Sequence, residues 1–279
     1  MYTYKPIRFY LTVFALTWAF WIPAAFAPEE YRMAFMLLGL FVPAVTAATT
    51  VLTSKNAALK ADFKAKLIGA FRVKPLVVLV AIASFFGIIA ASILLSTLAG
   101  QSLDQFSFVE GFSFSIDGSS ALLTIVLAAL LEELGWRGYA EDAIASYCSW
   151  WKESLIFGAV WALWHLPLFF VPDTYHYNIL QQSPLYMVNF FVSIMPLGFI
   201  VTWVYVKNER SIFACMIFHF FVNLLQEKVA MTQTTKCVET LVLFAAAAIV
   251  VATNRELFFE KRHIGRLLDE AHLRKERSK

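Results

Sequence analysis

Charged side chains are scarce in this sequence. Asp, Glu, Lys and Arg make up 15% of its 279 residues, against about 25% in an average soluble domain. Hydrophobic residues make up 59%, and phenylalanine alone occurs 27 times. A soluble fold of this length cannot bury so much apolar surface, whereas a lipid bilayer can. The scarcity of charge therefore excludes an ordinary soluble domain and favours an all-α polytopic membrane protein.

Cysteine is also rare, and one common zinc motif is missing. Cys148, Cys215 and Cys237 are widely spaced and form no CxxC pair, so we expect free thiols and no disulfide framework. The sequence has no HExxH motif, in which one helical turn presents two zinc ligands. The net charge is only +3, and the basic residues lie between and after the apolar segments. This pattern reflects membrane topology and argues against a nucleic-acid partner.

Apolar segments that approach the roughly 20 residues needed to cross a bilayer recur along the chain. We expect one integral membrane domain over residues 1–279. Its eight candidate spans are residues 9–27, 33–53, 75–99, 119–136, 154–172, 184–206, 211–227 and 236–253. The fourth and seventh are short and carry polar residues, but including them makes the loop charges alternate. The first segment follows Lys5 and Arg8 and also resembles a signal peptide; we expect an uncleaved helix.

The distribution of basic residues predicts the orientation. They concentrate in residues 54–74, in residues 207–210 and in the charged tail 254–279, whereas residues 100–118 and 173–183 contain none. We therefore expect both termini in the cytoplasm, and we expect the membrane to be that of a prokaryotic cell. Lys228 and Lys236 fall in an expected outside loop and disagree with this trend. The stretch 54–74 is either an amphipathic segment on the inner leaflet or simply a loop that sets the topology.

Ionisable residues inside the expected spans are costly and often functional. Within the fourth span, Glu133 and Arg137 lie four residues apart on one helical face and can pair. Glu132 is rotated by about 100° from Glu133 and has no such partner on its own helix. A carboxylate in that position is suited to act as a general base.

Two later spans each carry a histidine. In the fifth, Phe157, Trp161 and His165 recur every four residues; in the seventh, His219 and Asn223 share a face. Helical rise puts His165 about 16 Å and His219 about 12 Å from the cytoplasmic end of their spans. We therefore expect them to meet Glu132 in the cytoplasmic half of the bundle, at a cavity that opens to the cytoplasm.

Each of these features also has a structural interpretation. A single histidine in a membrane often forms an interhelical hydrogen bond. For Phe157 and Trp161 we expect packing, and for Glu133 and Arg137 a structural ion pair. The combination of Glu132, both histidines and Asn223 at compatible depths is what favours a catalytic site.

These motifs together resemble the CAAX protease and bacteriocin-processing family of intramembrane proteases, also called the Abi family. The family signature is EExxxR, then FxxxH, then HxxxN or HxxxD, on separate spans. Here the three motifs run from Glu132 to Arg137, from Trp161 to His165 and from His219 to Asn223. Trp161 stands where the family often has Phe. The resemblance covers residues 115–225, the expected catalytic core.

The resemblance implies cleavage of a peptide bond near the cytoplasmic membrane face. By carry-over, Glu132 and His165 activate a water, His219 and Asn223 hold the oxyanion, and Glu133 and Arg137 support the site. Eukaryotic members remove the last three residues of prenylated CAAX proteins. The implied partners are membrane lipids and a peptide or lipidated protein substrate; the oligomeric state stays open. A metal-free mechanism is favoured, with zinc on Glu132, His165 and His219 as the alternative.

Two other functions are compatible with the sequence. A bacteriocin-immunity or scaffold protein could keep the fold without turnover, although the intact polar set argues against a decayed site. A proton-coupled transporter also uses Glu and His inside the membrane. Such transporters commonly contain inverted repeats and paired broken helices, and neither pattern is evident here. We therefore expect an intramembrane endopeptidase.

Overall fold

The computed structural model describes residues 3–68, 73–111, 121–260 and 264. Within this part of the chain the regular elements are helices, and the only β-type pairing is an isolated bridge between Phe108 and Val229. The all-α prediction is therefore confirmed. Arg72, Asp117 and most of the expected charged tail, including Leu267 and Leu268, lie outside the described residues.

Twelve α-helices are described between Pro6 and Phe259. They are α1 Pro6–Ala24, α2 Glu29–Leu52, α3 Ala57–Ile68, α4 Pro75–Ser96, α5 Ala121–Gly135, α6 Glu141–Ala145, α7 Trp150–Trp164, α8 Tyr175–Gln182, α9 Pro184–Lys207, α10 Ile212–Lys228, α11 Gln233–Thr253 and α12 Arg255–Phe259. Short 3₁₀ turns are Thr97–Ala99, Leu103–Gln105 and Leu166–Phe170, and Trp136–Ala140 forms a π-helical turn.

Within the described part of the chain, six helical segments are long and apolar enough to cross a membrane. They are α1, α2, α4 with the turn that follows it, α7 with the turn that follows it, α9 and α11. The chain is therefore an integral membrane protein. The fourth and seventh expected spans correspond to α5 and α10, which have only 15 and 17 residues. The count of eight spans stays a prediction.

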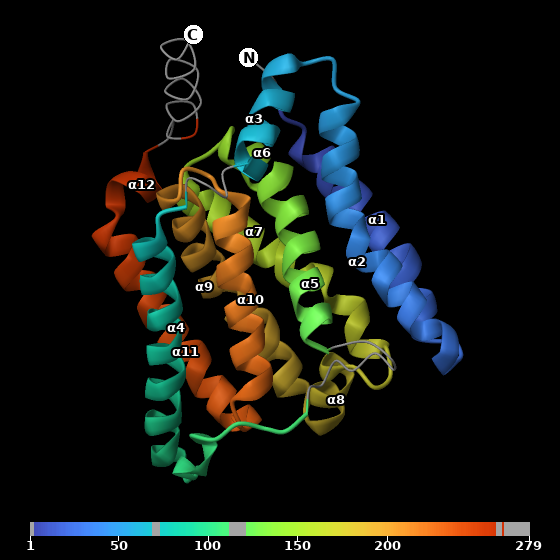
Figure 1. Cartoon of the computed structure of the whole chain (residues 1–279). Helices are drawn as coiled ribbons and strands as arrows, with labels where there is room; N and C mark the ends of the chain where they lie inside the picture. Colours follow the sequence, from blue (N-terminus) through green and yellow to red (C-terminus); the bar gives the residue numbers. More distant parts are fainter. Residues whose placement is uncertain (1–2, 69–72, 112–120, 261–263, 265–279) are drawn as a thin grey trace.

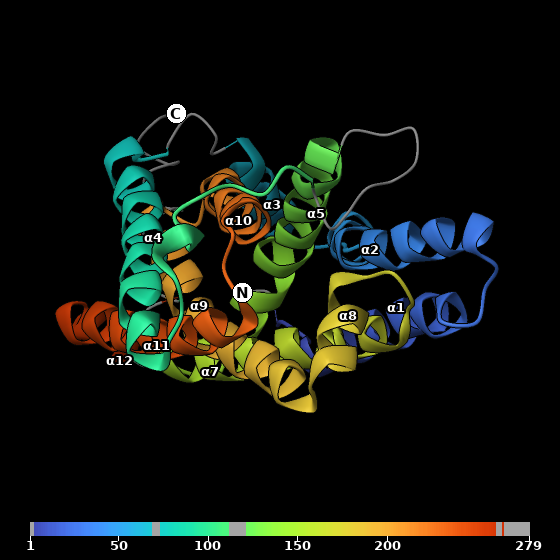
Figure 2. The same ribbon diagram turned by 90° about the horizontal axis from the view of Figure 1, so that it is seen from below.

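The bundle has two distinct ends (Figure 1). The beginning of α1 lies at one end together with α3, α6 and α12, which we call the α3/α6 end. The opposite end, which we call the α8 end, carries α8 and the link between α10 and α11; Figure 2 views the bundle from there. Because α5 runs toward the α3/α6 end while α7 runs back from it, their polar residues meet inside the bundle.

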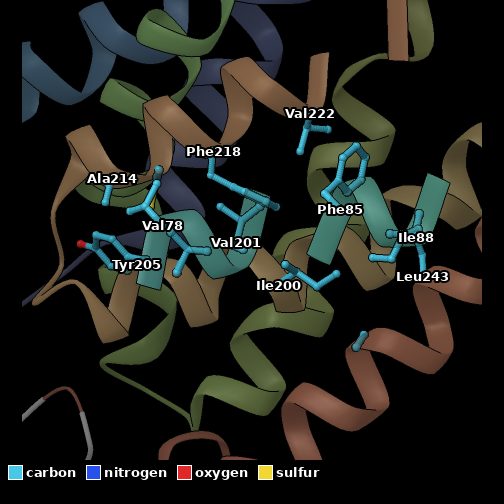
Figure 3. Close-up of a cluster of buried hydrophobic side chains, with 14 of the residues drawn as sticks. Val78, Phe85, Ile88, Ile200, Val201, Tyr205, Ala214, Phe218, Val222 and Leu243 are labelled. Atoms are coloured by element: carbon cyan, nitrogen blue, oxygen red, sulfur yellow. The ribbon is translucent and has the colours of Figure 1, made fainter. Parts of the chain in front are cut away.

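Two apolar clusters hold the helices together. One joins α4, α9, α10 and α11, with Phe85, Val201 and Phe218 almost completely buried (Figure 3). The other joins α1, α2, the α5–α6 run and α7. At the contact between α2 and α5, a Cβ on Gly135 would lie 2.4 Å from the Cβ of Pro43. The glycine thus permits the close approach that brings the α5 acidic residues between the two clusters.

The basic stretch 54–74 contains α3, and its expected place on the inner leaflet and its role in setting the topology stay predictions. Within it, α3 buries Leu59, Phe63 and Lys66 against the bundle, so this segment is docked by its side chains. The prediction of free cysteines is confirmed, since Cys148, Cys215 and Cys237 all lie in described segments and none is paired.

Candidate active site

The structure brings all four predicted catalytic side chains to one cavity of about 270 Å³. Glu132 comes from α5, His165 from the residue that ends α7, and His219 and Asn223 from successive turns of α10. Glu132 and His219 are buried, with 6% and 4% of their surface exposed. The helical spacing of the three motifs therefore predicted which side chains meet at this cavity.

The cavity extends toward one end of the bundle. Its lining runs from mid-bundle toward the α8 end, where Tyr175, Gln226, Gln233 and Lys236 border it. The predicted opening toward the cytoplasm therefore depends on which end of the bundle faces the cytoplasm, and it stays a prediction.

Glu132 has a partner that the sequence did not reveal. The Trp161 indole N–H donates a hydrogen bond to Glu132 Oε2 over 2.8 Å. The same ring lies 5.5 Å from the His219 ring and 6.1 Å from the His165 ring, centroid to centroid. Trp161 therefore packs in the apolar core, as expected, and in addition binds the carboxylate of Glu132. A tryptophan presents a single N–H donor on a rigid ring, so Trp161 fixes one carboxylate oxygen and leaves the other toward the cavity.

His165 is oriented by the end of its own helix. Its Nδ1 lies 2.7 Å from the carbonyl oxygen of Trp161. A carbonyl can only accept, so Nδ1 carries the hydrogen and, in the neutral ring, Nε2 keeps a free lone pair. The His165 ring also stacks on that of His176 from α8, with centroids 5.7 Å apart. Burial, and next the neighbouring His165, lower the pKa of His176 well below its usual value, so this second ring is neutral.

Glu133 connects the α5 ion pair to α10. Its Oε1 lies 3.0 Å from Arg137 Nη1, as the spacing predicted, and 2.8 Å from His219 Nδ1. Glu133 and Arg137 are completely buried. A carboxylate oxygen that binds both groups fixes the ring of His219, so that Nε2 is the nitrogen available to the cavity. Glu133 is therefore more than a structural partner of Arg137.

Arg137 has further contacts that account for its complete burial. Its Nη2 lies 3.0 Å from Glu141 Oε1, so two carboxylates flank the guanidinium one turn away on either side. The guanidinium carbon also lies 4.6 Å from the centre of the Phe157 ring. The aromatic face complements the positive charge, so the expected packing role of Phe157 includes support of this ion pair.

The π-helical turn Trp136–Ala140 connects the site to the α3/α6 end. Wider i to i+5 bonding alters the pairing of backbone carbonyls in such a turn. Lys66 donates to the carbonyls of Arg137 and Gly138 over 3.0 and 2.7 Å, and the Tyr205 hydroxyl donates to that of Arg137 over 3.1 Å. Helices α3 and α9 thus attach to the turn that directly follows the acidic pair of α5.

A network of paired charges surrounds this attachment. We call it the charge knot; it consists of Asp62, Lys66, Asp142, Tyr205 and Arg210. Arg210 holds Asp62 through two hydrogen bonds of 2.8 and 2.6 Å and also pairs with Asp142, which lies 2.8 Å from Lys66. Burial alone would raise the pKa of Asp62, but the charges of Arg210 and Lys66 lower it to about 2.

The grouping of candidate metal ligands can be examined in the described part of the chain. Among the described residues, no three His, Cys, Asp or Glu side chains are grouped so that they could hold a metal ion. The alternative ligand set of Glu132, His165 and His219 is thus not assembled, although each member borders the cavity. The three side chains are oriented by Trp161, by a backbone carbonyl and by Glu133.

Sequence reasoning overlooked three residues that border the cavity. His176 and Lys236 lie outside the three motifs, and Trp161 was assigned to packing. The one available signal was the charge of Lys236, which disagreed with the predicted topology. His176 follows a loop and occupies α8, an element too short and polar to be recognised as part of a membrane bundle.

Helices of an integral membrane bundle that bring a glutamate, two histidines and an asparagine to one internal cavity define the architecture of an intramembrane peptidase. Residues 117–225 match the family model described as type II CAAX prenyl endopeptidase, Rce1-like. The chain is also 42% identical over 265 residues to CAAX prenyl protease 2 of Methanococcus maripaludis, covering 93% of this chain and 98% of that protein. The chain belongs to this Rce1-like CAAX endopeptidase family and is an intramembrane protease.

Proposed function

We propose that the protein hydrolyses a peptide bond near the carboxyl terminus of a prenylated CAAX protein, with Glu132, His165, His219 and Asn223 as its catalytic residues. The observation that carries the proposal is the convergence of these four side chains on one cavity. The name of the Methanococcus relative, a CAAX prenyl protease, supports the substrate class. Cleavage after the prenylated cysteine would release the last three residues.

Glu132 and His165 are the groups suited to activate water. Trp161 binds Oε2 of Glu132 and so leaves Oε1, while His165 keeps a free Nε2 because its Nδ1 donates to a carbonyl. A water between Oε1 and Nε2 can give a proton to Glu132 as its oxygen bonds to the scissile carbonyl carbon. Trp161 touches neither water nor substrate in this scheme and acts as a positioning residue.

His219 and Asn223 are the groups suited to hold the oxyanion. They lie one turn apart on α10, and Nδ1 of His219 is occupied by Glu133. With Nε2 protonated as well, His219 donates toward the cavity beside the amide of Asn223, and the negative charge of Glu133 stabilises that imidazolium. Two fixed donors aimed at the developing charge are typical of oxyanion stabilisation. The C–N bond then breaks as Glu132 returns its proton to the leaving amine.

The mechanism we propose uses no metal. Its support is that, among the described residues, no three His, Cys, Asp or Glu side chains are grouped so that they could hold a metal ion. Strong chelators should therefore leave cleavage unchanged, and active protein should contain no stoichiometric zinc. Loss of cleavage with phenanthroline that zinc restores would contradict a metal-free reaction.

The apolar wall of the cavity supports a lipidated substrate. It is contributed mainly by α2 and α5 and includes Met33, Met36, Leu37, Leu40, Ile125 and Ala128. These side chains present no charge and can bury an isoprenoid, since apolar burial contributes about 25 cal/mol per Å². The opposite wall, on α10 and α11, is polar, which suits the peptide portion.

A direct assay tests the proposal. Purified protein in lipid nanodiscs is incubated with a geranylgeranylated CAAX peptide and with the same peptide lacking the lipid, and products are identified by mass spectrometry. We expect loss of the last three residues from the lipidated peptide alone, and no product with Glu132→Gln. Cleavage of the two peptides at equal rates would refute the lipidated substrate. Undiminished cleavage by Glu132→Gln would refute the assigned base.

A further inference from the structure

A lysine borders the polar end of the cavity and has no role in the chemistry described above. Among the described residues that line the cavity, Lys236 is the only lysine or arginine. Three acidic side chains, Glu132, Glu227 and Glu239, line the same space. A peptide that enters with its own carboxylate therefore meets repulsion from these groups, and a cation is needed wherever that carboxylate comes to rest.

The Lys236 ammonium is held in place by uncharged groups. Its Nζ lies 3.3 Å from the Tyr175 hydroxyl and 3.3 Å from the Gln226 carbonyl oxygen, and 4.7 Å from the centre of the Tyr175 ring. These partners are uncharged, and within the described part of the chain no carboxylate forms an ion pair of 4 Å or less with Lys236. An ammonium has three donors, so these two contacts leave one that a substrate anion can accept.

The separation between Lys236 and the oxyanion donors can be compared with the length of a peptide. Its partner Gln226 follows His219 by seven residues and Asn223 by three, on the same face of α10. At 1.5 Å per residue the Gln226 backbone lies about 10 Å along the helix from His219. An extended tripeptide also spans about 10 Å. A scissile carbonyl at His219 and Asn223 thus places the end of a three-residue leaving group near Lys236.

We propose that Lys236 binds the free C-terminal carboxylate of the substrate and so measures three residues from the scissile bond. Lys236 belongs to the first turns of α11, which begins at Gln233, and the partial positive charge of a helix N-terminus favours the same anion. This role also explains why a lysine lies where the charge pattern of the loops disfavours one. The inference rests on the proposed function, because it assumes a peptide with a free terminus.

The test compares three geranylgeranylated peptides. One ends in a free carboxylate three residues after the cysteine, the second ends there in an amide, and the third is extended by one alanine. With the wild-type protein we expect kcat/KM for the amide and the extended peptide to be about 10- to 100-fold lower than for the first, the range for a charge-assisted hydrogen bond. Lys236→Gln should lower only the first value, which removes the discrimination, and Lys236→Arg should restore most of it.

Lys228→Gln is a matched control, because Lys228 donates to the Val109 and Gly111 carbonyls and does not line the cavity. It should discriminate like the wild type. Equal cleavage of acid and amide by the wild type would overturn the inference without any variant, and so would a uniform loss with Lys236→Gln at unchanged thermal stability. If the wild type cleaves none of the three peptides, the proposed function itself fails and this inference fails with it.

Discussion

Two groups of buried charges occupy this bundle, and they differ in how completely their members are paired. In the charge knot, Arg210 and Lys66 each contact both Asp62 and Asp142, and Tyr205 donates to Asp142 as well. Around the cavity, Glu132 has one donor on one oxygen, and His165 and His219 are each held through Nδ1. Charged groups with several partners of opposite charge join helices together. Groups that are bound through one atom only keep another atom available for reaction.

The largest expected effect separates reaction from stability at Glu132. Glu132→Gln keeps the size of the side chain and an acceptor for the Trp161 indole, but it cannot take a proton from water. We expect cleavage to fall by about 10³-fold or more, within the range for a lost general base, with the melting temperature nearly unchanged. Turnover and thermal melting are the measurements. Substantial remaining cleavage would contradict the assignment of Glu132 as the base and would favour Glu133 in that role.

Glu133 contacts both Arg137 and His219, so its substitution should reduce both stability and activity. Glu133→Gln leaves Arg137 with only Glu141 and removes the charge that holds His219. Breaking a buried ion pair typically costs about 3–5 kcal/mol, so we expect a lower melting temperature or expression together with loss of activity. Arg137→Gln should behave similarly. A Glu133→Gln protein that is inactive yet as stable as the wild type would contradict this assignment.

The charge knot should affect stability without affecting the reaction. The Asp62 pKa of about 2 lies below its usual 3.8, so its ionised form stabilises the fold fully above about pH 4, and this contribution is lost as the pH falls through about 2. One such shift corresponds to about 2 kcal/mol. Asp62→Asn should lower stability at neutral pH by about that amount and flatten the acid dependence. Turnover per folded molecule should not change; a fall in it would connect the knot to catalysis.

Substitution of Trp161 should have a smaller effect on cleavage, and this effect should be confined to the chemical step. Trp161→Phe keeps an aromatic ring beside both histidines but removes the N–H that holds Glu132. We expect kcat to fall about tenfold, the value of one charge-assisted hydrogen bond, with KM unchanged. Trp18→Phe is the control, since its indole donates to the Trp164 carbonyl away from Glu132. Equal effects of the two variants would reduce Trp161 to a packing residue.

The last prediction concerns the orientation of the bundle in the membrane, and it involves neither rate nor stability. It states which end of the bundle faces the cytoplasm. The basic residues of 54–74 and 207–210 predict that the α3/α6 end is cytoplasmic. A reporter fused after Lys279 should then act only as a cytoplasmic probe, and a substrate would reach the cavity through the plane of the membrane. The opposite result would place the polar α8 end of the cavity directly in the cytoplasm.

The sequence predicted those parts of the site that depend on contacts within one helix. The Glu133–Arg137 pair and the shared face of His219 and Asn223 follow from a period of 3.6 residues. The contact of Trp161 with Glu132 joins α7 to α5, and no spacing along a single helix contains it. The burial of Lys66 escaped prediction for the same reason: its acceptors are carbonyls of a π-helical turn that only the assembled fold presents.

The order of synthesis gives the α5 ion pairs a further importance. During translation, α5 leaves the ribosome before α7, α9 and α10, so Glu133 and Arg137 emerge before Trp161, Tyr205 and His219 can contact them. Because Arg137 is flanked by Glu133 and Glu141 on its own helical run, this segment neutralises its cation without any later helix, and intrahelical pairing lowers the cost of inserting charge. Helix α10 then packs against an α5 segment whose ion pairs have already formed. Completion of the active site is therefore a late step in the assembly of the bundle.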